Sequence, residues 1–217
     1  MRRDQRPRNG LGALSPYDGC REERPDSRRK ASDEPQNTRG HTLPLETGRL
    51  VLRPLSADDV DPLHRISNEP LVRLYLWDDQ PNSEATIKGL IAHSDRTFSK
   101  EKIGLFGVRL RGREDLLGFC GFVCLEGMEE PELCYELTQK MWGRDIATQA
   151  AQACLRYAFE GVGLERVIAG AKAPNTTSLR VIEKLGMKCL GNINPSAPDE
   201  PYCALCRKEF VAATVMG

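Results

Sequence analysis

The segment 142–147, Trp-Gly-Arg-Asp-Ile-Ala, constrains the fold more than any other part of this chain. The residues before it, 133–137, have the composition of a β-strand, and small and apolar residues after it recur at helical spacing from Ala147 to Ala158. A strand that turns through a glycine-containing loop into a helix directs several free backbone N–H groups at one point. These donors and the helix dipole together form an anion site, most often a phosphate site. On these residues alone, an ordinary strand-to-helix turn of an α/β domain explains the pattern equally well.

Length, charge and hydropathy narrow the class of protein. The chain has 217 residues, enough for one well-packed domain with a tail, and its 31 Lys and Arg balance its 31 Asp and Glu. This balance makes nucleic acid an unlikely partner. The longest apolar run, 116–125, contains two glycines and is too short to span a bilayer, and the charged N-terminus has no apolar signal segment. We therefore expect a cytoplasmic protein, a monomer or homodimer, without membrane contact.

Residues 1–42 differ in composition from the rest. They are rich in Arg, Pro, Asp, Ser and Gly and contain few large apolar residues, so they bury too little surface to offset the loss of chain entropy. We expect a disordered polar tail over 1–42 and a single folded domain over 43–217. Arg28, Arg29 and Lys30 would suit an acidic partner, but a solvated tail is the simpler interpretation.

We interpret the eight cysteines as structural. Most lie in apolar segments, where cysteine behaves as a small hydrophobic residue. Cys203 and Cys206 have the CxxC spacing, but on a strand an offset of three directs the two thiols to opposite faces. Cys120 and Cys124 would share a strand face at a separation of roughly 13 Å. Neither pair can chelate one metal ion, so we expect no metal site.

Periodicity and turn signals predict one α/β domain. The predicted strands are 49–55, 103–110, 116–125, 132–138, 166–171, 187–192 and 202–211. The predicted helices begin near 56–59, 82–83, 147 and 175, and they end near 68, 99, 160 and 185. Residues 71–77 are ambiguous between strand and helix. A three-strand meander followed by crossover connections predicts a mixed sheet with helices on both faces.

Five short motifs, in this order, resemble those of the GNAT acetyltransferases. They are Gly118-Phe-Cys-Gly121, Tyr135-Glu-Leu137, Trp142-Gly-Arg-Asp-Ile-Ala-Thr-Gln-Ala150, Asn175-Thr-Thr-Ser178 and Glu183-Lys-Leu-Gly-Met187. The most similar branch is the RimJ/RimL type, which includes the ribosomal-protein N-terminal acetyltransferases, and the resemblance extends over about residues 46–210. It implies a mostly antiparallel sheet of six to seven strands. It also implies a splayed parallel pair, the strand ending at Leu137 and the strand 166–171, that forms a notch for acetyl-CoA.

The resemblance implies acetyl-CoA as co-substrate, with its pyrophosphate at the anion site. The family's loop, Q/R-x-x-G-x-G/A, falls on residues 142–147, and the pantetheine arm would pair like an added strand with the backbone near Leu137 and Thr138. The acetyl carbonyl would lie near a backbone N–H that stabilises the developing oxyanion. The cofactor-binding residues expected from this resemblance are Leu137, Thr138, Trp142, Gly143, Arg144, Asp145, Ile146, Ala147, Thr148 and Asn175.

Asp145 departs from the family pattern, which usually has glycine there. Glycine suits a position where the backbone approaches a ligand closely. A carboxylate at ~5 Å from a phosphate charge costs roughly 3 kcal/mol at an effective dielectric near 20. The Asp145 side chain would either cap the helix and occupy the donors that the pyrophosphate needs, or turn to solvent at little cost.

The expected reaction is direct attack of a neutral amine on the thioester carbonyl. Glu132 and Glu136 are the candidate general bases, because they share one strand face beside the thioester, with Cys134 between them. Glu126 is a third choice. The family resemblance implies that Ser178 protonates the departing thiolate and that Asn175 contacts the pantetheine. The structural alternatives are that Ser178 is a plain first-turn residue and that Asn175 is a plain helix cap. The tyrosine acid that the family usually has further along this helix is absent, since Leu179, Arg180, Val181 and Ile182 follow Ser178.

Two functions of different classes follow. The first is an acyltransferase, specifically an N-acetyltransferase that acetylates a primary amine of a peptide or protein N-terminus or of a small molecule. The second is a non-catalytic or weakly active acyl-CoA-binding protein, which the departure at Asp145 suggests. Acidic residues in the loops that wall the acceptor side would suit a cationic acceptor. They are Glu126, Glu129, Glu130, Asp199 and Glu200.

Overall fold

The computed structural model describes residues 43–125, 128–192 and 200–210. The expected polar tail, 1–42, lies outside these residues, and so do Glu126 and Asp199.

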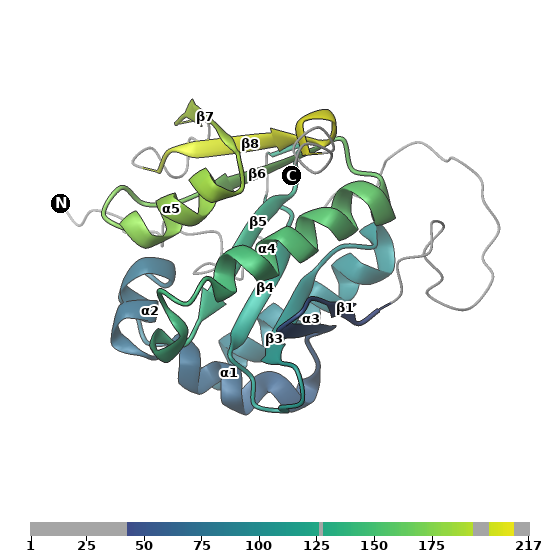
Figure 1. Cartoon of the computed structure of the whole chain (residues 1–217). Coiled ribbons are helices and arrows are strands. Elements are labelled where there is room, and N and C mark those ends of the chain that lie inside the picture. Colours follow the sequence, from purple (N-terminus) through teal and green to yellow (C-terminus); the bar gives the residue numbers. More distant parts are fainter. Residues whose placement is uncertain (1–42, 126–127, 193–199, 211–217) are drawn as a thin grey trace.

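One sheet of eight strands forms the centre of the domain, in the order β1-β2-β3-β4-β5-β6-β8-β7 (Figure 1). The strands are β1 (Leu45–Glu46), β2 (Leu50–Pro54), β3 (Leu105–Leu110), β4 (Gly118–Val123), β5 (Glu132–Leu137), β6 (Arg166–Gly170), β7 (Lys188–Gly191) and β8 (Tyr202–Cys206). Neighbouring strands are antiparallel except β5 and β6, which are parallel. The mixed, mostly antiparallel sheet is confirmed. The predicted count of six to seven strands is one too low, because β1 has only two residues and carries no periodic signal.

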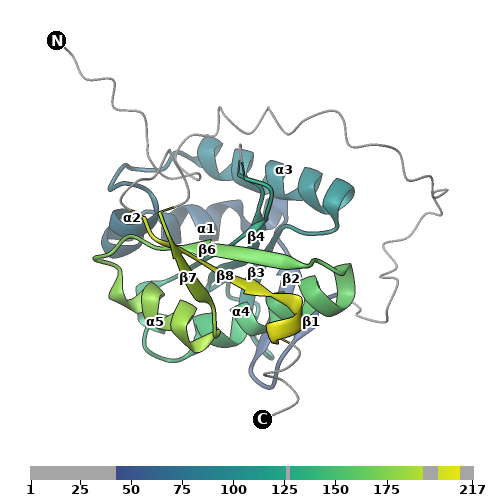
Figure 2. The ribbon, with the colours of Figure 1, turned by 90° about the horizontal axis from the view of Figure 1, so that it is seen from above.

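Helices cover both faces of the sheet, as predicted (Figure 2). Helices α1 (Val60–Ser67), α2 (Pro70–Leu76) and α3 (Glu84–Glu101) lie on one side, and α4 (Ile146–Arg156) and α5 (Thr176–Lys184) lie on the other. Helix α4 continues into a π-helical turn, Tyr157–Val162. The ambiguous segment 71–77 is mainly helical, and Pro70 at the first position of α2 favours this because its φ is already that of a helix.

The core has two main layers, one on each face of the sheet. On the α4 and α5 face, Phe106, Leu137 and Ile146 belong to one buried cluster. On the α1 to α3 face, Trp77 and Phe119 belong to another. All residues of β4 are buried, as expected for a strand that lies within the apolar run 116–125 and between β3 and β5 in the sheet. None of the described helices is long and apolar enough to cross a membrane.

The C-terminal part contains one disulfide that was not predicted, and one expectation about it is wrong. Cys189 and Cys203 are directly opposite in the antiparallel register of β7 and β8 and form a disulfide, which is a structural role for these two cysteines. The last strand ends at Cys206 and does not extend to residue 211, because residues 207–210 form a helical turn. The Glu209 carboxylate turns back in this segment and accepts a hydrogen bond from the Cys206 amide at 3.1 Å.

Candidate active site

The site begins where β5 and β6 separate. In the described part of the sheet the two strands are in register at one pair of residues, Glu132 and Ile168. On the other edge of β5, the Thr138 amide donates to the Leu117 carbonyl. Since alternate residues of a strand direct their backbone groups to the same neighbour, the N–H and C=O of Tyr135 and Leu137 point into the gap toward β6. The expected splay of the parallel pair is therefore present, and it exposes backbone donors and acceptors.

Gly118 fixes the course of β5 near this splay. Its φ is +139°, in the region that favours glycine, and a Cβ atom added there would lie 1.9 Å from the Glu136 carbonyl oxygen. The start of β4 thus approaches the end of β5 more closely than any side chain allows.

A cavity of about 350 Å³ lies at the splay. Helix α2, the end of β5, the loop before α4, the first turn of α4, and α5 line it. The predicted site residues among its lining are Glu136, Leu137, Trp142, Gly143, Asp145, Ile146, Ala147, Thr148, Asn175 and Ser178. Glu132, Thr138 and Arg144 are not among them. Sequence reasoning missed the residues of α2, all residues of α5 other than Ser178, and two further residues. They are Val72, Tyr75, Leu76, Thr177, Arg180, Val181, Lys184, Tyr135 and Met141.

The cavity reaches both faces of the sheet. Tyr135 contacts the buried cluster beneath α4 and α5. Its neighbour Glu136 points the opposite way, to residues of the α1–α2 region. Residues of α2 line the same cavity as residues of α4 and α5, so elements from both faces of the sheet border it.

Asp145 is the N-cap residue of α4 and has a left-handed backbone, with φ +62°. Its carboxylate makes no cap hydrogen bond to the α4 amides. It instead accepts a hydrogen bond from Lys184 Nζ of α5 at 2.9 Å. This bond lowers the pKa of Asp145, with smaller contributions from the Thr148 and Gln149 side chains. The structure agrees with the second predicted alternative, since the carboxylate leaves the helix amides free and its side chain is 45% exposed, with exposed Lys184 as its partner.

The Leu137 carbonyl and the Thr138 hydroxyl, at the end of β5, already have hydrogen-bond partners. The indole N–H of Trp142 donates to the Leu137 carbonyl at 2.8 Å, and the Trp142 ring lies 6.3 Å from that of Tyr75. The Thr138 hydroxyl donates to the Glu69 carboxylate at 2.6 Å, and the same carboxylate accepts from the Gln139 amide at 2.8 Å. Of the backbone groups expected to pair with pantetheine, the Leu137 N–H is the one that points into the gap. The Arg144 carbonyl accepts a hydrogen bond from Arg49 Nη1 at 3.4 Å.

Two carboxyl groups lie on the α1–α3 face of β5. Glu136 is buried and accepts hydrogen bonds from Ser67 Oγ and from Trp77 Nε1, both at 2.7 Å. Burial raises its pKa to about 7, although these two donors oppose the shift. Glu132 is half-buried and accepts a hydrogen bond from the Gly170 amide at 3.3 Å. Burial, and then repulsion by Glu200, raise the pKa of Glu132 to about 8.

Charged residues surround the C-terminal end of β6 on the α1–α3 face of the sheet. Glu200 approaches Gly170, with its Oε1 3.1 Å from the position of an added Cβ atom. Lys172 forms an ion pair with Asp78, which follows α2. This pair links the segment after β6 to the end of α2, across the side of the sheet that holds Glu132.

Two hydroxyl groups meet on the α4–α5 face. The Tyr135 hydroxyl lies 2.7 Å from Ser178 Oγ and also 3.2 Å from the Ser178 carbonyl oxygen. Burial raises the pKa of Tyr135, so its hydroxyl stays protonated. The Asn175 side chain accepts a hydrogen bond from the Ser178 amide at 3.1 Å, so Asn175 is the N-cap of α5 as well as part of the cavity wall.

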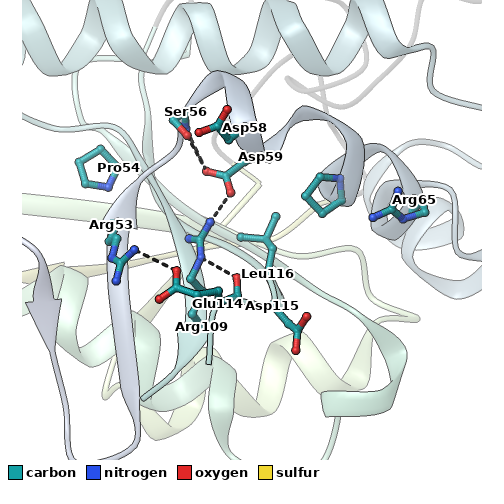
Figure 3. A pocket seen from close by; sticks show the side chains of 11 residues that line it. Arg53, Pro54, Ser56, Asp58, Asp59, Arg65, Arg109, Glu114, Asp115 and Leu116 are labelled. Atoms are coloured by element: carbon teal, nitrogen blue, oxygen red, sulfur yellow. Dashed lines mark hydrogen bonds and ion pairs between the residues drawn. The ribbon is translucent and has the colours of Figure 1, made fainter. Parts of the chain in front are cut away.

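A second cavity, of about 490 Å³, lies between β2, α1 and the turn that joins β3 to β4 (Figure 3). Its lining is strongly charged, but Arg109 pairs with the buried Asp59 and Arg53 pairs with Glu114. It shares no residue with the cavity at the splay. We therefore regard the cavity at the splay as the candidate active site.

Comparisons with known proteins agree with this geometry. Residues 49–188 match the family model described as the acetyltransferase (GNAT) domain. The uncharacterized N-acetyltransferase YnaD of Bacillus subtilis (strain 168) is 27% identical over 172 residues, which cover 76% of this chain and 98% of YnaD. The crystal structure of a GNAT-family acetyltransferase from Bacillus anthracis has a TM-score of 0.63 and 26% identity, and the match covers 76% of this chain and 99% of that one. The structure of RimL, a ribosomal L7/L12 alpha-N-protein acetyltransferase in complex with coenzyme A, shares the fold at 17% identity, with a TM-score of 0.62 and coverage of 77% and 98%.

Proposed function

Because the match over residues 49–188 makes this chain a member of the GNAT acetyltransferase family, we propose that it is an acetyl-CoA-dependent N-acetyltransferase. It transfers an acetyl group to a primary amine, of a peptide or protein N-terminus or of a small molecule, by direct attack of the amine on the thioester. The observation that carries this proposal is the cavity at the end of β5, which α2 lines from one face of the sheet and α4 and α5, with Ser178, line from the other. The co-substrate and the amine can thus meet from opposite faces.

The residues around the cavity fit acetyl-CoA, which supplies the activated acetyl group. The first turn of α4 offers amide N–H groups and the positive end of the helix dipole to a pyrophosphate. Arg180 and Lys184 add two cations from the facing helix α5. Lys184 also offsets the charge of Asp145, so the carboxylate in place of the family's glycine is compatible with a phosphate group nearby.

We propose Glu132 as the general base and Glu136 as a structural acid. Both oxygens of Glu136 are engaged, by Ser67 and Trp77, and they fix the α1–α2 region against β5. Glu132 lies one pleat further along the same face and does not itself line the cavity, so in this proposal the amine proton reaches it through a bridging water molecule. Its pKa of about 8 is close to that of an α-amine, so proton transfer between them is nearly balanced.

Ser178 acts on the leaving group in this proposal. Its hydroxyl lines the cavity on the α5 side, next to the splay. It donates a hydrogen bond to the sulfur that departs from the acetyl group, while the N–H groups that point into the splay stabilise the carbonyl oxygen.

The acidic residues on the Glu132 side favour a cationic acceptor. Glu132, Glu136 and Glu200 gather around β5 and the end of β6, and the cation that pairs there, Lys172, is already bound to Asp78. Since the pKa values of Glu132 and Glu136 are raised to about 8 and about 7, these carboxyl groups attract a positively charged substrate increasingly as the pH rises through this range, and ionised Glu132 can take the proton of the amine. Since RimL is named for the α-amine of a protein, peptides with a free N-terminus are the first acceptors to test.

Two measurements on the full chain test the proposal. Isothermal titration calorimetry with acetyl-CoA should detect binding, and release of free CoA thiol should require an amine from a panel of peptides, polyamines and aminoglycosides. No binding at millimolar acetyl-CoA would overturn the proposal. Binding without thiol release across the panel would instead support the non-catalytic acyl-CoA-binding protein.

A further inference from the structure

Tyr135 and Ser178 form a hydroxyl pair that joins β5 to α5 at the cavity. Their oxygens are 2.7 Å apart, although the residues are separated by 43 positions in the chain. Ser178 is fixed at the first turn of α5 by the Asn175 cap, and Tyr135 is fixed by its place in β5. Both side chains line the cavity, so the pair is part of its wall.

Each hydroxyl has one hydrogen, and this allows two arrangements. In the first, Tyr135 donates to the Ser178 carbonyl, which lies 3.2 Å away, and Ser178 donates back to the Tyr135 oxygen. The Ser178 hydrogen then points away from the cavity. In the second, Tyr135 donates to Ser178 Oγ, and the Ser178 hydrogen is free to point into the cavity. The 2.7 Å separation of the two hydroxyl oxygens fits a bond in either direction, but the 3.2 Å from the Tyr135 oxygen to the Ser178 carbonyl exceeds the usual length of about 2.5–3.0 Å for an O–H···O bond. The Tyr135 hydrogen therefore has its better acceptor in Ser178 Oγ, as in the second arrangement.

We propose that Tyr135 is a positioning residue, which donates to Ser178 Oγ and thereby directs the Ser178 hydrogen at the sulfur of the departing coenzyme A. This inference rests on the proposed function and adds a residue from β5 to its leaving-group machinery. As the amine nitrogen bonds to the acetyl carbon, the C–S bond breaks and sulfur keeps the electron pair. The amine proton goes to Glu132, Ser178 donates its hydrogen bond to the sulfur, and water protonates the thiolate after release.

Two further observations support this role. No tyrosine follows Ser178 on α5, so a tyrosine hydroxyl at the leaving group has to come from another element. The burial that raises the Tyr135 pKa also keeps its hydrogen in place, so Tyr135 remains a donor over the neutral range. A phenylalanine at this position keeps the packing and removes only the donor.

The test compares Tyr135→Phe, Ser178→Ala and the double variant, using acetyl-CoA and an amine that the wild-type chain acetylates. We expect Tyr135→Phe to lower kcat about tenfold or more, the lower part of the range for proton-transfer groups, with the KM for acetyl-CoA changed less than about twofold. Ser178→Ala should lower kcat at least as much. The double variant should be no slower than Ser178→Ala alone, because Tyr135 acts through Ser178. Tyr157→Phe is the matched control, since Tyr157 donates to the Lys102 carbonyl away from the cavity and its loss should leave kcat unchanged.

Two results would overturn the inference alone: Tyr135→Phe with wild-type kcat, or equal fractional losses from Tyr135→Phe in the wild-type and Ser178→Ala backgrounds. The second result would indicate a packing role. A wild-type chain that binds acetyl-CoA but acetylates no amine would overturn the proposed function, and the inference with it. Melting temperatures of all variants identify any that lose kcat through unfolding.

Discussion

Replacement of Glu132 by glutamine tests the assignment of the general base. The variant keeps the size of the side chain and an acceptor for the Gly170 amide, but it cannot take a proton. With a pKa of about 8, only about one in a hundred wild-type molecules has ionised Glu132 at pH 6, and about half have it at pH 8. The rate that depends on this carboxylate should therefore rise about 50-fold between these pH values.

The assay is the ratio of kcat/KM between wild type and Glu132→Gln, measured with one amine from pH 6 to 9.5. The ratio cancels the ionisation of the amine itself, which has a pKa near 7.7–8.0 for an α-amine. It should rise with pH, level off above about 8, and reach at least about a hundredfold, the usual contribution of a general base. Glu200→Gln should move the inflection of the wild-type profile to lower pH, because it removes a charge that repels ionised Glu132.

The matched control is Glu136→Gln on the same strand face. If Glu136 were the base, its pKa of about 7 would place the inflection one unit lower, and the rise from pH 6 to 8 would be only about tenfold. A flat ratio for Glu132→Gln, together with a ratio for Glu136→Gln that levels off near pH 7, would refute the assignment and transfer the role to Glu136.

Three other perturbations have defined outcomes. Because the buried Glu136 keeps its proton up to about pH 7 whereas an unfolded chain loses it near 4.5, this group should contribute about 3 kcal/mol to the loss of stability as the pH rises from 4 to 8, in addition to the contribution of Glu132. In urea unfolding, Glu136→Gln should show a fall that is smaller than that of the wild type by about this amount, and an unaltered fall would contradict the buried-acid account. Asp145→Gly should tighten acetyl-CoA binding by less than about tenfold in the wild type, but by up to about a hundredfold in a Lys184→Ala background, where only the weaker contacts of Thr148 and Gln149 stabilise the carboxylate. Calorimetry with acetyl-pantetheine, which lacks the pyrophosphate, should show no tighter binding after Asp145→Gly in either background. Gly118→Ala should lower the free energy of unfolding by at least about 1–3 kcal/mol, the cost of a strained backbone, and near-wild-type stability would show that β4 can move away from β5.

The local pattern of residues predicted the elements that build the site. The composition of 133–137, the glycine in the loop and the helical spacing after Ala147 act over a few residues each, so β5, the loop and α4 were found at nearly their observed bounds. The central place of β4 followed from its unbroken apolar run. The motif order identified the family, which the match over residues 49–188 confirms. The missed elements are β1, with two residues, and α2, with seven, which are too short for a periodic signal.

Only the tertiary structure decided which side chains meet. Ser178 and Tyr135 are 43 residues apart, Glu136 and Trp77 are 59 apart, and Lys184 and Asp145 are 39 apart. The Cys189–Cys203 pair likewise depends on the register of two strands joined by a loop. Residue types and their spacing along the chain determine which face of an element a side chain occupies. The distance between two faces depends on how whole elements pack, and so does the pKa shift that burial imposes on Glu132 and Glu136.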